Sequence, residues 1–144
     1  SSRNEALESL LLDSLPSVPI LRENPVDCLV ITGDLVDSRL GDSAFVNAKK
    51  AIRKLAKALG TRTVVITPGN HDLKIRGLLL RSERGFRRHF LKYYRPIAYS
   101  DVGVLLYPLD STPSRIGARG QVKDEDYAAL DFSMAEGEAM ELSL

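Results

Sequence analysis

Polar side chains that bind metal ions or carry protons follow two apolar runs of the chain. Four residues stand out: Asp34, Asn70, His71 and Asp72. The first follows the run at residues 28–32 and the other three follow the run at residues 63–67, each time with a glycine in between. If both runs are strands of one sheet, these residues lie at strand ends, where α/β folds bind ligands. The pattern therefore indicates metal-assisted phosphate chemistry.

Each of these side chains suits a different task at a metal centre. Carboxylates and imidazoles bind divalent ions of the manganese, iron, zinc and nickel class, so Asp34 could bridge two of them. Asn70 offers a neutral amide oxygen to one metal. His71 could stay off the metals as a general acid, with its ring held by Asp72 or Asp37. Two metals about 3.5–4 Å apart would polarise a phosphoryl group and generate a hydroxide nucleophile.

Each motif alone also has a purely structural explanation. Glycine followed by aspartate is a common turn after a strand, and Asn-His-Asp could be a turn closed by its own side chains. Two apolar runs about one β-α-β unit apart, both ending in this way, favour the functional interpretation over the structural one.

The elements that would position these residues can be read from the hydrophobic pattern. Strands are predicted at residues 27–32 and 62–67, with a helix to Leu59 between them that Asp42 or Ser43 could cap. The apolar stripe of that helix is predicted as Val46, Ile52, Leu55, Ala56 and Leu59, with Gly60 just past its end. Such a β-α-β order usually gives parallel strands, so the predicted fold class is α/β.

The flanking segments follow a less regular pattern. A helix over residues 4–15 should end at Pro16 and Pro19 and lead into a connector. After His71, residues 78–94 are predicted to form one helix that is interrupted or bent near Gly85. A strand over residues 102–109 and a final helix over residues 124–136 complete one predicted domain of 144 residues.

Composition narrows the class of protein. Apolar residues make up 44% of the chain and charged residues 27%, with a net charge of +1, so no global field favours a membrane or nucleic-acid partner. No stretch reaches the ~18 apolar residues of a membrane helix. One cysteine, Cys28, excludes an internal disulfide, and we expect it to pack as a small hydrophobe. These features predict a soluble, cytoplasmic protein without a membrane partner.

The two loops resemble signature blocks of a known family. Residues 31–37, Ile-Thr-Gly-Asp-Leu-Val-Asp, and residues 67–72, Thr-Pro-Gly-Asn-His-Asp, are similar to the second and third blocks of the calcineurin-like metallophosphoesterases. Residues 109–112 and 120–122 resemble the bacterial cyclic-nucleotide phosphodiesterase-like branch, and the whole resemblance covers residues 24–136.

The resemblance implies a fold, a cofactor and residue roles. It implies stacked mixed β-sheets flanked by helices, which form a metallophosphoesterase-type sandwich around two divalent metal ions, manganese among the candidates. Asp34 would bridge the metals, Asn70 would bind the second one, and His71 would be the acid that contacts phosphate. A small phosphoester would be the substrate, with phosphodiesters favoured over monoesters.

Several blocks of the family pattern are missing from the chain. No Asp-x-His precedes Asp34, no Gly-His-x-His follows, and the only other histidine is His89, whose context is that of a surface or packing residue. We therefore expect a core truncated at both ends, lacking its first strand and its last ligand blocks. The parent protein would be a hydrolase, and the 144-residue chain alone would be inactive.

Two charged features leave alternatives open. Residues 74–95 carry eight basic side chains and one acid, which could steer a phosphoester or nucleic acid, or could be a solvated surface. Arg39 could reach a phosphate with two hydrogen bonds. The alternative functions are a non-catalytic scaffold that keeps the fold for protein contacts and a DNA-processing nuclease. The oligomeric state is open.

Overall fold

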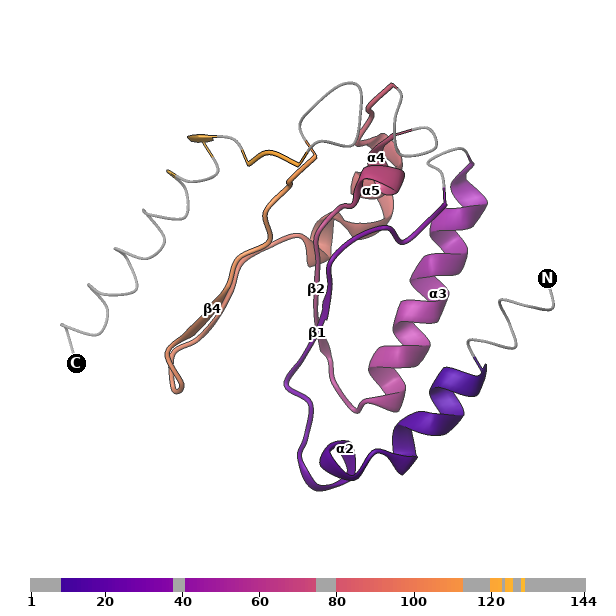
Figure 1. Cartoon of the computed structure of the whole chain (residues 1–144), viewed down its shortest axis with the longest axis vertical. Helices are drawn as coiled ribbons and strands as arrows, with labels where there is room; N and C mark the ends of the chain where they lie inside the picture. The colour runs from indigo at the N-terminus through magenta and orange to yellow at the C-terminus, as the bar shows by residue number, and fades with distance from the viewer. Residues whose placement is uncertain are drawn as a thin grey trace.

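Two parallel strands form the centre of the computed structural model (Figure 1). Strand β1 (Cys28–Ile31) pairs with β2 (Thr63–Ile66), and helix α3 (Asp42–Ala58) connects them. The register sets Cys28 opposite Thr63, so both strands end at the same edge of the pair. The structure describes residues 9–37, 41–74, 80–112, 120–122, 124–125 and 128. The predicted β-α-β unit and the α/β fold class are confirmed.

Helix α3 packs against the core through most of the predicted stripe, with Phe45 in place of Val46. Phe45, Ile52 and Ala56 are its buried residues, whereas Val46 is exposed. Placing Val46 in the core was wrong, because Phe45 lies seven residues, or two turns, before Ile52 and so shares the face of Ile52 and Ala56.

The ends of α3 are set by two glycines. The residue before the helix is Gly41, with φ +96°, and no side chain caps the helix, so the predicted capping by Asp42 or Ser43 is wrong. At the other end Gly60 takes φ +73°, as expected for the residue after a helix.

The core gathers side chains from both strands, from α3 and from the segments that follow β2. Its buried members are Val36, Phe45, Ile52, Ile66, Leu73, Phe86 and Phe90. Phe90 lies edge-on to Phe45, with ring centroids 6.2 Å apart, and 5.7 Å from the ring centroid of Phe86. The contact between Phe45 and Phe90 fastens helix α5 (Arg84–Phe90) to α3.

The segment after β2 is more broken than predicted. It forms α4 (Asn70–Leu73), α5 and the 3-10 turn η2 (Leu91–Tyr93), in place of one helix over residues 78–94. Residues 80–83 are not helical, and Ser82 N donates a hydrogen bond to Leu73 O over 2.7 Å, a tertiary contact that overrides local helix propensity. Gly85 lies in the first turn of α5 against Phe45, which explains the glycine without a bend.

An antiparallel hairpin follows: β3 (Ile97–Tyr99) and β4 (Val104–Leu106). The predicted strand over residues 102–109 is therefore shorter, and β3 was missed because it has only three residues. Tyr99 Oη donates a hydrogen bond to Asp27 O over 3.2 Å, which ties the hairpin to the start of β1. The described sheets are this hairpin and the parallel pair, so they show part of the predicted sandwich.

The N-terminal segment also differs from the prediction. Residues 9–14 are helical as expected, followed by η1 (Leu15–Ser17), but the predicted connector contains α2 (Pro19–Glu23), with proline at its first position. Most of the predicted final helix lies outside the described residues. Within the part that the structure describes, no helix has the length and apolar character needed to cross a membrane.

Candidate functional site

The loops that follow β1 and β2 lie in direct contact through their glycines. Gly33 has φ +99°, and a Cβ added to it would lie 2.3 Å from Gly69 N. A Cβ added to Gly69 would lie 2.1 Å from Asp34 Oδ1 and 2.3 Å from Asp34 N. Both positions therefore exclude any side chain, and the close approach brings the two predicted motifs together at one edge of the sheet.

Asp34 occupies a strained backbone position at the centre of this contact. Its φ is +54°, an uncommon value for a residue with a side chain. Its Oδ1 accepts a hydrogen bond from the main-chain N–H of His71 over 3.1 Å, and the residue is exposed. The carboxylate therefore faces solvent at the edge while being held by the loop after β2. Strain of this kind is concentrated at functional sites.

Asp72 fastens the two loops from the inside. It is completely buried, its Oδ1 accepts a hydrogen bond from Val36 N over 3.1 Å, and its Oδ2 accepts one from Gly69 N over 2.9 Å. Burial raises the pKa of the Asp72 carboxyl, and the main-chain donors only partly offset that effect. Its geometry is that of a residue that positions the site.

The ring of His71 is held by the loop after β1. Its Nδ1 lies 2.6 Å from the main-chain oxygen of Asp37, so the ring donates from Nδ1, and Nε2 is left to exchange a proton. The Asp37 carboxylate is 4.0 Å from Nδ1 and fully exposed. The main-chain carbonyl of Asp37 therefore holds the ring, where a carboxylate of Asp72 or Asp37 was predicted to do so, and the oxygens of Asp72 are engaged by the main chain.

The two predicted metal ligands, Asp34 and Asn70, both lie among the described residues. Asn70 begins α4 directly beside the Gly69–Asp34 contact, so a carboxylate and an amide belong to the same edge. No group of three or more histidine, cysteine, aspartate or glutamate side chains able to hold a metal occurs among the described residues. Two oxygen donors do not complete the shell of a divalent ion, so these residues alone do not fit a metal pair. Arg39 lies outside the described residues.

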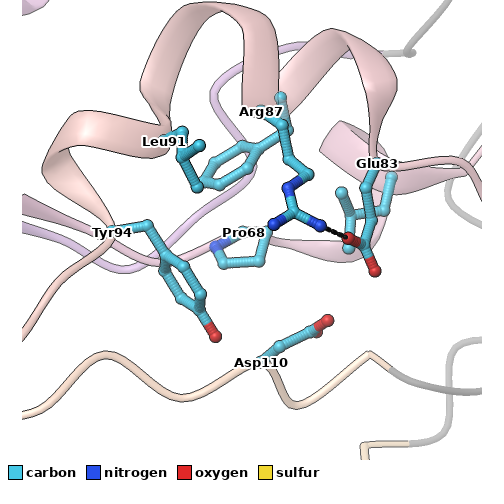
Figure 2. Close-up of a pocket in the computed structure, with 8 residues that line it drawn as sticks. Pro68, Glu83, Arg87, Leu91, Tyr94 and Asp110 are labelled. Atoms are coloured by element: carbon cyan, nitrogen blue, oxygen red, sulfur yellow. Dashed lines mark hydrogen bonds and ion pairs between the residues drawn. The ribbon is translucent and has the colours of Figure 1, made fainter.

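A pocket of about 180 Å³ adjoins the loop on the side of α5 (Figure 2). It is lined by Pro68, Leu73, Glu83, Phe86, Arg87, Leu91, Tyr94 and Asp110. Figure 2 shows the guanidinium of Arg87 turned to Glu83. The two side chains form an ion pair with an N–O distance of 3.2 Å. The mixed lining of aromatic and charged groups could accept part of a ligand that reaches the edge of the sheet.

Arg81 joins the segment before α5 to residues 110–112 beside this pocket, a role that sequence reasoning missed. Its Nε donates to Thr112 O over 3.0 Å, and its two terminal nitrogens pair with Glu83 and Asp110. Asp110 Oδ1 in turn accepts from Thr112 N over 2.8 Å. The resemblance at residues 109–112 was the signal available, and nothing in it pointed to Arg81.

Three cations of the predicted basic segment are paired with acids within the described residues. Arg81 and Arg87 pair with Glu83, and Arg88 pairs with Asp42 over 3.3 Å. His89 stacks on Phe45, with ring centroids 5.7 Å apart, and its Nε2 lies 3.0 Å from Asp42 Oδ1. His89 is therefore a packing residue, as its sequence context indicated.

Comparison with known proteins gives one clear result. The family model described as calcineurin-like phosphoesterase matches residues 4–126. This match covers both loops, both parallel strands and the hairpin. Neither the search of curated proteins nor the search of solved structures finds a significant match.

Proposed function

Because the chain belongs to the calcineurin-like phosphoesterase family, we propose that the loops after β1 and β2 form part of a two-metal centre that hydrolyses phosphoester bonds. The family is one of metal-dependent phosphoester hydrolases, which sets the general class of activity. The observation that carries the finer proposal is the Asp34–His71 hydrogen bond of 3.1 Å, because it joins the two motifs at one strand edge.

The proposal gives each residue of the edge a role. Asp34 and Asn70 are ligands of divalent ions of the manganese, iron, zinc or nickel class, which would polarise the phosphoryl group when bound. His71, held at Nδ1 by the Asp37 carbonyl oxygen, presents Nε2 to a phosphate oxygen and transfers a proton there. Asp72 acts on the reaction indirectly, by fixing the main chain at Val36 and Gly69.

The small number of metal ligands limits the activity that we expect of the 144-residue chain alone. The described residues contribute only Asp34 and Asn70. Since the only histidines of the chain are His71 and His89, the histidine ligands that the family resemblance implies would have to come from outside the 144 residues. We therefore propose that the 144-residue chain alone is inactive or nearly so, and that the active form is a longer cytoplasmic protein. Phosphodiesters are the favoured substrates, on the resemblance of residues 109–112 and 120–122.

The test compares two chains on two substrates. Manganese-dependent hydrolysis of bis(p-nitrophenyl) phosphate and of p-nitrophenyl phosphate is measured for the 144-residue chain and for the longest chain that its gene encodes. The longer chain should hydrolyse the diester faster. In it, Asp34→Asn and His71→Ala should each lower kcat by about 10²-fold or more, whereas Lys50→Ala, on the exposed face of α3, should not. Rapid hydrolysis by the short chain would contradict the proposed limit.

A scaffold without catalysis is the second candidate. The observation that favours it is the lack of a metal-binding group among the described residues. It predicts that the longest encoded chain neither binds manganese nor hydrolyses either substrate. Metal content measured after purification in manganese separates the two candidates, because the hydrolase should hold about two ions per chain.

A further inference from the structure

A second pocket lies at the opposite end of the parallel strands from the candidate site. It measures about 420 Å³ and is lined by Ile52, Arg53, Ala56, Lys57, Gly60, Thr61, Arg62, Val64, Lys92 and Tyr93. Because Arg62 precedes β2 and Asn70 follows it, the four-residue strand separates the two places by roughly 13 Å at least. The pocket is therefore distinct from the loops that carry Asp34 and His71.

Four cations from three elements converge on this pocket. Arg53 and Lys57 are one turn apart on α3, Arg62 precedes β2, and Lys92 belongs to η2. All four are exposed, and none of the described lining residues is acidic. The contrast is with α5 and its flanks, where Arg81, Arg87 and Arg88 each pair with a carboxylate. Positive charge without a local counter-charge is a feature of this pocket.

The environment of Tyr93 shows the same local field. Lys92 Nζ lies 4.5 Å from the centroid of the Tyr93 ring. Burial raises the pKa of the Tyr93 hydroxyl, but the neighbouring charges of Lys92 and Arg53 outweigh burial and lower that pKa below its usual value. The pocket is thus lined by an aromatic residue as well as by four cations, two of which, Lys92 and Arg53, lie beside its ring.

We propose that this cationic pocket binds the phosphate backbone of a single-stranded nucleic acid. Four exposed cations around one pocket suit a chain with several phosphates, whereas a small phosphorylated ligand is normally enclosed. A membrane surface is less suitable, because the apolar lining residues Ile52, Ala56 and Val64 are buried or half-buried and offer no side chain for insertion. The choice of a polymeric phosphodiester draws on the proposed function, and the binding itself requires no hydrolysis.

Fluorescence anisotropy of a labelled 20-nucleotide single strand, titrated with the 144-residue chain in EDTA and 50 mM salt, tests this proposal. EDTA removes metal, so the result is independent of the proposed hydrolysis. The affinity should fall with salt along a logarithmic slope of about −3, as expected for four phosphate contacts. Lys57→Glu and Arg62→Glu should each weaken binding by at least about fivefold at 50 mM salt and make the slope less steep.

The matched control is Arg84→Glu, which changes the charge equally at an exposed position of α5 that does not line the pocket. It should bind within about twofold of the unchanged chain, and circular dichroism should show that all variants fold. Equal weakening by all three variants would overturn the proposal in favour of a general charge effect. So would absence of oligonucleotide binding, whether or not the chain then binds vesicles that contain anionic lipid.

Discussion

Gly33 and Gly69 face each other so closely that a Cβ on Gly33 would lie 2.3 Å from the main-chain nitrogen of Gly69. This approach lets the loop after β1 and the loop after β2 share hydrogen bonds, among them the one from His71 N to Asp34 Oδ1. The two sequence motifs are thus one structural unit, and their glycines are required by packing before any chemistry is considered.

Substitution of Gly33 by alanine should therefore cost far more than substitution of other glycines with positive φ. Gly60 has φ +73° but open space around its Cα, so Gly60→Ala should cost only the strain of about 1–2 kcal/mol. Gly33→Ala adds a main-chain clash and should cost at least about 2 kcal/mol more. Urea unfolding of both variants measures the difference, and equal losses would show that the two loops can move apart.

The pH dependence of the free energy of unfolding should reflect the raised pKa of Asp72. Its folded pKa is raised above the unfolded value of 3.8, so between these two values the folded state binds more protons than the unfolded state. The free energy of unfolding, taken relative to Asp72→Asn, should therefore fall as pH rises from 3.8 through the folded pKa. Urea unfolding at several pH values checks this. A relative stability that increases with pH would mean that the main-chain donors outweigh burial and lower the pKa.

The sequence was sufficient to predict the parallel pair and the two loops because local signals and tertiary structure agree there. Residues 28–31 and 63–66 are mostly β-branched or apolar, and each run leads to a glycine at the strand end. The hydrogen bond of His71 to the Asp37 carbonyl could not be predicted, since it depends on the exact approach of two loops 34 residues apart.

Predictions failed where tertiary contacts decide the local structure. The helix expected over residues 78–94 begins only at Arg84. Before it, Ser82 N donates a hydrogen bond to Leu73 O, which holds residues 80–83 in a non-helical conformation. The basic run looked uniform in sequence, but its charges separate in space. Arg87 and Arg88 pair with acids, while Lys92 joins Arg53 and Lys57 from a helix about 40 residues earlier.

Substitution of Gly85 by a larger residue should be opposed by a neighbouring side chain, whereas substitution of Gly33 is opposed by the main chain. An added Cβ would lie 2.5 Å from Phe45 Cε2, so Gly85→Ala combines overpacking of about 1–3 kcal/mol with a gain in helix propensity of about 1 kcal/mol. The net result should be a loss of about 1 kcal/mol. In a Phe45→Leu background the clash is removed, and Gly85→Ala should become neutral or stabilising. A double-mutant cycle measures this coupling, and additive effects would contradict the contact.

Arg81 should be the most important cation for stability among the described residues around the first pocket. Its side chain is 16% exposed and binds Glu83, Asp110 and the Thr112 carbonyl oxygen, so Arg81→Met would leave two carboxylates without their shared partner. The expected loss is about 2–4 kcal/mol. Arg81→Lys should recover only part of it, because an ammonium group cannot reproduce the planar fork.

Arg87→Met is the matched control: its pair with Glu83 is largely exposed, so the loss should stay below about 1 kcal/mol. Urea unfolding ranks the three variants, and an Arg81→Met loss as small as that of Arg87→Met would show that the segment carrying Asp110 docks without this arginine.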